Sequence, residues 1–249
     1  MEEQVTRLVD KVWDKYLKTP PERRLMIAIG GIPGSGKTTL SQTLTAALNA
    51  RHATLDPSSP SQTAHPIAVF VPMDGYHLTR AQLSAMPDPI TAHARRGAEF
   101  TFDGAAYARL IAALRSAPLL PSSGGAAATT ILAPSFDHAT KDPAPDTIAV
   151  LPSHRVVVVE GNYVLLDREP WRSAAALFDE RWFVDVADVA VARARLRRRH
   201  VAAGIAATEE EADRRAVEND LPNGEEIVRL RLPADEVIAS REDGAWVHV

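Results

Sequence analysis

Residues 25–38 read LMIAIGGIPGSGKT and set the architecture of this 249-residue chain. The last eight letters, from Gly31 to Thr38, match the pattern G-x-x-x-x-G-K-[ST] in full. An apolar run (25–29) precedes the glycines and a helical segment (41–48) follows them, which is the order of strand, loop and helix that the pattern requires. Glycines let the backbone curl until its N–H groups point at phosphate oxygens, and the helix start adds partial positive charge. The stretch therefore predicts a nucleotide-binding phosphate loop.

Within this loop, two side chains have roles that follow from their chemistry. Lys37 is expected to reach the β- and γ-phosphates, and the Thr38 hydroxyl is expected to bind Mg²⁺. The residues expected around the nucleotide are Gly31, Pro33, Gly34, Ser35, Gly36, Lys37, Thr38 and Thr39. The alternative, a glycine turn with an incidental lysine, is disfavoured because a full match arises rarely by chance.

Three more apolar runs, at 66–73, 155–160 and 180–185, predict buried strands. They alternate with helical segments, a pattern typical of an α/β fold with a parallel, doubly wound sheet. An amphipathic helix over 1–20 precedes them, and Pro20 and Pro21 end it. Another helix is expected over 105–114 with Asp103 as its N-cap, followed by a low-complexity loop at 116–130. We find no internal repeat, so we expect a single domain over 1–249.

Composition excludes several classes of protein. The net charge is -4 with 24% charged residues, which argues against a nucleic-acid partner. Cysteine is absent, so the chain has neither disulfides nor a thiolate metal site. Residues 1–18 contain no apolar block and no run is long enough to span a membrane, so we expect a cytoplasmic protein without a membrane partner.

Two acidic residues follow predicted strands. Asp74 lies in MDGYH (73–77) after the second strand, where a carboxylate could accept the proton of a substrate hydroxyl or bind Mg²⁺; a turn aspartate before Gly75 is the equal alternative. Glu160 ends the run VVVVE and is expected to support Mg²⁺, since an acid left at the end of a buried strand is costly without a cation.

A basic helix is predicted over 188–203, followed by a second helix over 208–219. Five arginines lie within seven residues, and Arg195 and Arg199 share a face because they are four apart. We expect a helical lid over 188–220 whose arginines approach the transferred phosphoryl group; a solvated basic face is the alternative.

The motifs together resemble a known family. The order GGIPGSGKTT, MDGYH, RRGAEFTFD, PSFDHATKDP, VVVEGNYVLLDREPW, RLRRRH and ENDLPNG resembles the uridine kinase, phosphoribulokinase and type I pantothenate kinase superfamily, most closely its uridine-kinase-like branch in fungi and bacteria. The likeness runs from about residue 25 to residue 240. It implies a P-loop NTPase fold with a five-stranded, mostly parallel core and a helical lid.

The resemblance also implies site residues. Asp74 and Lys37, with the lid arginines Arg195 and Arg199, match catalytic positions, and the segment 219–223 would lie near the nucleotide base. The residues that match substrate-side segments are His77, Arg95, Phe102, Asp103, Phe136 and His138. Phe102 could equally be a core residue and Asp103 a helix cap. The nucleoside-binding pattern of true uridine kinases is not reproduced across 95–103, which argues against uridine itself as the substrate.

Two functions compete. The first is a kinase that uses ATP and Mg²⁺ to phosphorylate a hydroxyl of a small molecule, such as a nucleoside, a pantothenate-like compound or a sugar. The second is an ATP-binding regulator or assembly factor, which would need neither Asp74 nor the segment 95–103. The presence of both favours the kinase. An N-K-x-D element, expected of a GTPase, is absent. A homodimer is common among such enzymes and is an expectation from the resemblance alone.

Overall fold

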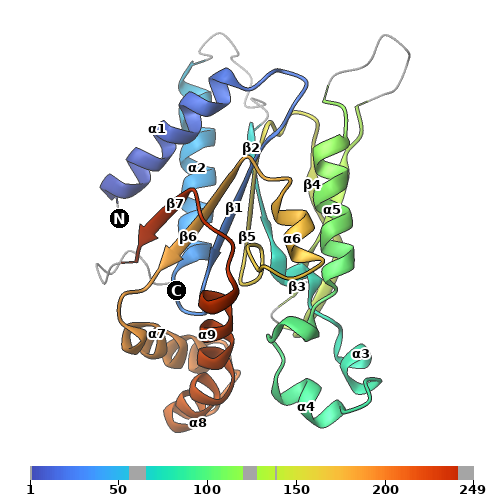
Figure 1. The fold of residues 1–249 in the computed structure, drawn as a ribbon, viewed down its shortest axis with the longest axis vertical. Coiled ribbons are helices and arrows are strands. Elements are labelled where there is room, and N and C mark those ends of the chain that lie inside the picture. Colours follow the sequence, from blue (N-terminus) through green and yellow to red (C-terminus); the bar gives the residue numbers. More distant parts are fainter. Residues whose placement is uncertain (1, 56–65, 120–127, 138, 241–249) are drawn as a thin grey trace.

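A parallel five-stranded sheet organises the chain in the computed structural model, which describes residues 2–55, 66–119, 128–137 and 139–240 (Figure 1). In spatial order the strands are β2 (Ala68–Pro72), β5 (Val156–Gly161), β1 (Leu25–Gly31), β6 (Glu180–Asp185) and β7 (Glu236–Ala239). The predicted α/β class and the parallel pairing of the four predicted strands are confirmed. The fifth strand, β7, pairs in parallel with β6 at one edge.

The central strands β1 and β5 are buried along their whole length. This is why their sequences are continuous apolar runs rather than alternations of apolar and polar residues. The β1–β5 register pairs Ile29 with Glu160 and Gly30 with Gly161. The strand register therefore places the acid at the end of β5 beside the first glycines of the loop.

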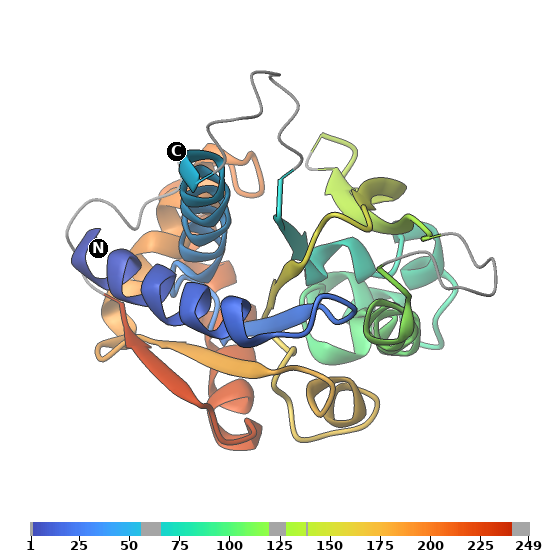
Figure 2. The same ribbon diagram turned by 90° about the horizontal axis from the view of Figure 1, so that it is seen from above.

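Helices cover both faces of the sheet (Figure 2). On one face lie α1 (Glu2–Lys18) and α2 (Lys37–Leu55), and on the other lie α5 (Gly104–Ser116) and α6 (Trp171–Ala175). The predicted N-terminal helix packs through its apolar stripe, with Leu8 and Trp13 at 0% and 5% exposure. Each such buried side chain contributes about 1.5–3 kcal/mol, so α1 is an integral cover of the sheet. In the part of the chain that the structure describes, no helix has both the length and the apolarity needed to cross a bilayer.

A second, two-stranded antiparallel sheet was not predicted. It joins β3 (Ile131–Asp137) and β4 (Asp142–Val150). The prolines of β4, at 143 and 145, argue against a strand by pattern alone, but this hairpin is separate from the main sheet and tolerates them. It packs on the turn η1 (Met73–Tyr76), where a Cβ on Gly75 would lie 2.2 Å from the Pro134 carbonyl oxygen.

Two groups of short helices lie beyond the carboxyl ends of the strands (Figure 1). One group follows η1 and comprises α3 (Arg80–Ser84), α4 (Pro89–Ala94) and η2 (Glu99–Thr101). The other comprises α7 (Val189–Ala202), α8 (Glu209–Arg215), the π-helical turn η3 (Ala216–Asp220) and α9 (Leu221–Leu230). The basic helix is as predicted, but the second predicted helix, 208–219, ends its α-helical part at Arg215. Pro222 explains the change, because a proline cannot donate to the preceding turn.

Candidate active site

The loop between β1 and α2 curls through two glycines of positive φ, Gly34 at 78° and Gly36 at 86°. At Gly34 a Cβ would also lie 2.7 Å from the Ala192 carbonyl oxygen, because α7 packs directly on the loop. At Gly31 a Cβ would lie 2.7 Å from Ser35 Oγ. The glycines of the motif are therefore required by backbone conformation and by close packing together.

The loop has the features of an anion cradle. The hydroxyl oxygens of Ser35 and Thr39 are buried and have no hydrogen-bond partner among the described residues. Lys37 is buried, and its Nζ lies 3.4 Å from the Ile32 carbonyl oxygen and 3.8 Å from a Glu160 carboxylate oxygen. Buried polar groups in folded proteins normally have partners. Phosphate oxygens over the loop would supply them, so these residues fit a nucleoside triphosphate.

Glu160 and Lys37 form a buried pair beside the loop. Burial raises the pKa of the Glu160 carboxyl to about 7; the Lys37 charge opposes this shift and the Asp74 charge adds to it. Burial likewise lowers the pKa of Lys37, against the attraction of Glu160. The Thr38 side chain hydrogen-bonds to Glu160. Oxygen donors of this kind suit Mg²⁺, which takes one or two carboxylates together with phosphate oxygens and water.

Asp74 lies in η1, two residues beyond Pro72, which pairs with Glu160 in the β2–β5 register. Its side chain is exposed. Its charge acts on both Lys37 and Glu160, so the predicted base and the predicted metal-side acid face the same space. Open α/β sheets bind ligands at this edge, outside the carboxyl ends of the strands.

The two predicted lid arginines lie in different surroundings. Arg199 is exposed, and its charge acts on Lys37 and Glu160. Arg195 is buried and donates to the Gly34 carbonyl oxygen at 3.3 Å and to Ser240 Oγ at 2.7 Å. Arg195 thus holds the loop backbone, while Arg199 faces the cluster of charges. Two further arginines bind α8: Arg193 pairs with Asp213, and Arg197 with Glu209.

Three aromatic side chains predicted for the substrate side are brought together. The His77 ring lies 4.0 Å from the Phe102 ring and 5.0 Å from the Phe136 ring. His77 Nδ1 also lies 2.8 Å from the Asp74 carbonyl oxygen, which ties this aromatic wall to the predicted base. The wall is suited to hold an organic acceptor next to Asp74.

Comparisons with known proteins identify the family of the chain. An ATP-dependent kinase-like protein, notR', of Aspergillus versicolor is 54% identical over 166 residues, which cover 67% of this chain and 92% of that protein. The chain belongs to the uridine kinase, phosphoribulokinase and type I pantothenate kinase superfamily of P-loop kinases. The ATP-dependent kinase YFH7 of Lachancea thermotolerans is 32% identical over 250 residues, covering 90% of this chain and 68% of its own length.

Comparison with solved structures also finds a YFH7 protein. The crystal structure of YFH7 from Saccharomyces cerevisiae matches with a TM-score of 0.81 at 24% identity, over 96% of this chain and 99% of that one. Models of protein families give no match. The P-loop NTPase fold implied by the sequence motifs is thus confirmed.

Within this kinase, the remaining predicted residues divide by their contacts. Asp103 caps α5, since its carboxylate accepts from the Ala106 N–H at 2.8 Å, as the helix-cap alternative predicted. Phe102 is 7% exposed and also contacts the rings of Tyr163 and Trp171, so it is a core residue that reaches the wall. His138 lies outside the described residues.

One residue of the site, Tyr163, and one contact between predicted residues were not foreseen from the sequence. The Tyr163 hydroxyl donates to the Gly97 carbonyl oxygen at 2.8 Å, joining the segment after β5 to the substrate side. Tyr163 ends the motif EGNY, three residues after Glu160, and this position could have indicated it from the sequence. The segment 219–223, expected near the nucleotide base, contacts Arg95 through Asn219 and Asn223. Sequence spacing carried no signal for that contact.

Proposed function

We propose that this P-loop kinase transfers the γ-phosphoryl group of ATP to a hydroxyl of a small molecule, making it a phosphotransferase with an alcohol acceptor. The observation that supports this most is the meeting of Lys37, Thr38, Glu160 and Asp74 at one edge of the sheet. A nucleotide switch has no use for an exposed carboxylate beside an aromatic wall, whereas an acceptor kinase needs both. Acceptors of the proposed class are nucleosides, pantothenate-like compounds and sugars.

In the proposed reaction the acceptor oxygen attacks the γ-phosphorus while the bond from that phosphorus to the bridging oxygen breaks, which releases ADP. Asp74 accepts the proton of the attacking hydroxyl. Lys37 and Arg199 face the charge that develops on the phosphoryl oxygens, and the loop N–H groups orient the phosphates. The rate gain comes from position and electrostatics, because phosphoryl transfer needs little covalent help.

Mg²⁺ is part of the proposal, with Thr38 and Glu160 as the groups that would hold it directly or through water. When bound, such an ion neutralises phosphate charge and lowers the barrier to displacement. It would also favour ionised Glu160, whose pKa burial raises to about 7. Asp74 is a further candidate ligand from the sequence, and its exposed position leaves it free for the acceptor hydroxyl.

The proposal is tested by measuring ATP consumption by the purified protein with Mg²⁺ against a panel of nucleosides, sugars, pantothenate and glycerate. Lys37→Ala is the blank, because it removes the cation that contacts the phosphates. We expect at least one acceptor to raise ADP release well above the blank. Tight ATP binding without acceptor-dependent turnover across the panel would instead favour the nucleotide-binding regulator.

A further inference from the structure

The guanidinium of Arg95, the residue after α4, is held by two buried carboxamides. Its Nε donates to Asn219 Oδ1 at 3.0 Å and its Nη2 donates to Asn223 Oδ1 at 2.8 Å. Asn219 and Asn223 are 3% and 2% exposed, and Asn219 Nδ2 is fixed in turn by the Arg96 carbonyl oxygen at 2.9 Å. We call Asn219 and Asn223 the asparagine clamp. The clamp orients the guanidinium and leaves part of its five N–H donors for another partner.

This clamp is electrically neutral, unlike those of the neighbouring arginines. Arg96 pairs with Asp142 at 2.9 Å. Arg168 pairs with Glu226 at 3.0 Å and with Glu99 at 3.4 Å. Among the described residues Arg95 forms no ion pair. A carboxylate would bind a guanidinium more strongly than a carboxamide does, so the two asparagines hold the charge without neutralising it.

The acidic groups whose charges act on Tyr163 together with Arg95 have partners of their own. Along with Arg95, the charges of Glu226, Glu99 and Asp220 act on the Tyr163 hydroxyl. Arg168 donates hydrogen bonds to both Glu226 and Glu99. Glu99 also accepts from the Trp171 indole N–H at 2.8 Å. Asp220 is hydrogen-bonded to His200 Nε2 at 2.8 Å. The positive charge of Arg95 thus remains available.

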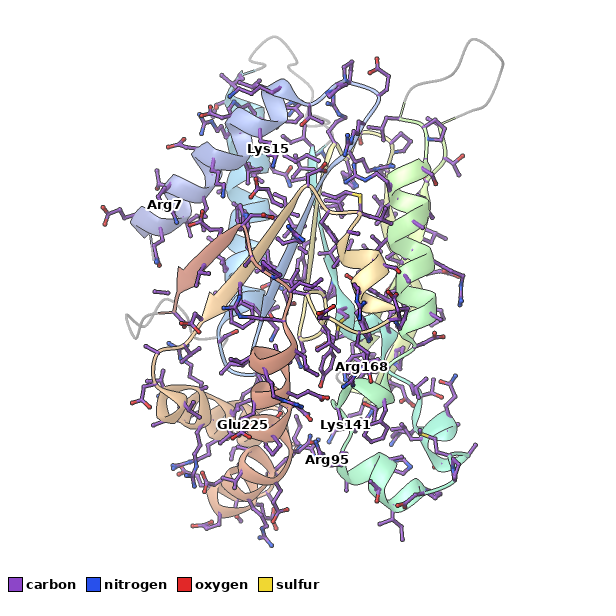
Figure 3. All side chains as sticks on the ribbon, in the orientation of Figure 1. Arg7, Lys15, Arg95, Lys141, Arg168 and Glu225 are labelled. Carbon is purple, nitrogen blue, oxygen red and sulfur yellow. The ribbon has the colours of Figure 1, made fainter. Side chains whose placement is uncertain are left out.

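Arg95 lies at the far end of the wall that begins at Asp74. Two residues after it, the Gly97 carbonyl oxygen accepts from Tyr163, whose ring lies 5.5 Å from Phe102. The wall then continues through His77 to the backbone of Asp74. Figure 3 places Arg95 between the α3–α4 segment and α9. An acceptor lying along this wall would have its hydroxyl near Asp74 at one end and would face Arg95 at the other.

We propose that Arg95 binds an anionic group of the acceptor, so that the substrate is an alcohol that also carries a carboxylate or a phosphate. This inference rests on the proposed kinase function. A partly buried charge without a counter-ion is costly, and the substrate anion supplies that counter-ion through charge-assisted hydrogen bonds. The planar guanidinium suits either anion, because both can accept two parallel N–H bonds.

The first experiment compares acceptors that differ only in the anionic group: glycerol with glycerate and glycerol 3-phosphate, ribose with ribose 5-phosphate, and pantothenol with pantothenate. We expect kcat/KM to be larger for a charged member than for its neutral partner, by about 10-fold or more. The carboxylate and phosphate arms tell the two anions apart. Equal turnover of neutral and charged members overturns the anionic acceptor and leaves the kinase standing. Turnover of neither above the Lys37→Ala blank overturns both.

The second experiment removes the charge. Arg95→Gln is expected to lower kcat/KM for the charged acceptor by about 10- to 100-fold more than for its neutral partner, with ATP affinity retained. The control is Arg172→Gln, which removes the same charge from an exposed ion pair with Asp167 and should change neither. If Arg95 merely fastens α4 to η3 and α9, charged and neutral acceptors lose turnover together, which contradicts the proposal.

The third experiment keeps the clamp and cancels the charge. Asn223→Asp preserves the shape of the clamp, and Asn223 Nδ2 makes a single long contact, 3.5 Å to Asn219 Oδ1. We expect KM for the charged acceptor to rise while the thermal midpoint does not fall, since the clamp gains an ion pair. An unchanged KM in the folded variant would overturn the proposal. Should the variant not fold, Arg95→Gln with the matched acceptors decides the same question.

Discussion

Asp74 and Glu160 are carboxylates at the ends of neighbouring strands, but their surroundings differ. Asp74 is exposed in η1, whereas Glu160 is 5% exposed against Lys37. Burial raises the pKa of Glu160 to about 7 even beside Lys37, so without a bound metal ion a large part of the Glu160 population is protonated at neutral pH. Exposure of Asp74 supports its proposed role as proton acceptor, and the place of Glu160 beside Lys37 at the phosphate loop supports its proposed role at the metal.

The role of Asp74 leads to the first prediction. Asp74→Asn should lower kcat by roughly 10²- to 10⁴-fold, because an amide cannot accept the proton of the acceptor hydroxyl. ATP affinity should be retained, since Asp74 lies outside the phosphate loop. Steady-state kinetics with a turned-over acceptor, together with calorimetric titration of ATP, separate the two quantities. Undiminished kcat in this variant would remove Asp74 from the mechanism.

The raised pKa of Glu160 leads to the second prediction, which concerns stability. Between the ordinary value of 4.5 and about 7, folded Glu160 holds a proton that the unfolded chain has lost. The free energy of unfolding of the nucleotide-free protein therefore falls as pH rises through this window.

Glu160→Gln should remove this contribution. As the pH rises from about 4.5 to about 7.5, the free energy of unfolding of the variant should rise relative to that of the wild type by on the order of 1–3 kcal/mol. Urea unfolding of both proteins at several pH values, without nucleotide or Mg²⁺, measures the difference. A constant difference between the two proteins across the window would contradict the buried, proton-holding state of Glu160.

At the scale of elements, the phosphate loop depends on the helix packed upon it. The Ala192 carbonyl oxygen would lie 2.7 Å from a Cβ on Gly34, and Arg195 on the same helix donates to the Gly34 carbonyl oxygen. Through these contacts α7 supports the curled backbone from outside. The helix that carries the predicted lid arginines therefore also supports the phosphate loop.

Two glycines of positive φ provide the third prediction. Gly34→Ala combines backbone strain with a collision against α7, whereas Gly204→Ala, at φ 61°, meets nothing within 4 Å. Both should lose about 1–2 kcal/mol of stability from the left-handed backbone. Gly34→Ala should in addition lose ATP affinity, because the loop or α7 must shift. Calorimetry with ATP and thermal unfolding of both variants test this, and equal ATP affinities would show that α7 does not support the loop.

At the scale of the whole molecule, the sheet separates two hydrophobic cores, and among the described residues only one of them contacts the aromatic wall. One core, under α1 and α2, contains Trp182; the other, under α5 and α6, contains Trp171. Both tryptophans are 0% exposed, and each indole N–H donates to a glutamate, Glu180 and Glu99 respectively. Trp171 also contacts Phe102 and Tyr163, so the core under α5 and α6 supports the aromatic wall.

This matched pair provides the fourth prediction. Trp171→Phe and Trp182→Phe should each lower the free energy of unfolding by about 1–3 kcal/mol, since each leaves a small void and removes an indole hydrogen bond to a glutamate. KM for the acceptor should change in Trp171→Phe alone. Urea unfolding and acceptor kinetics are the measurements; a similar change of KM in Trp182→Phe would show that the two cores do not act separately on the site.

The loop, the buried strands, the basic helix and the positions of Asp74 and Glu160 could be predicted from the sequence. The loop depends on backbone freedom at glycine and the strands on burial of apolar runs, and both causes act between near neighbours in the sequence. The two acids lie close together because the carboxyl ends of parallel strands share one edge of the sheet. The cap of Asp103 is equally local, since its carboxylate accepts from a backbone N–H three residues ahead.

The grouping of the acceptor side could not be predicted from local pattern. Arg95 meets its two asparagines across 124 and 128 residues of chain, and Trp171 meets Glu99 across 72. No periodicity encodes such pairs, because they depend on how α4, η3 and α9 pack beyond the sheet. The sequence thus specified the phosphate loop and its neighbouring acids through short-range backbone chemistry, while long-range packing assembled the half of the site proposed to bind the acceptor.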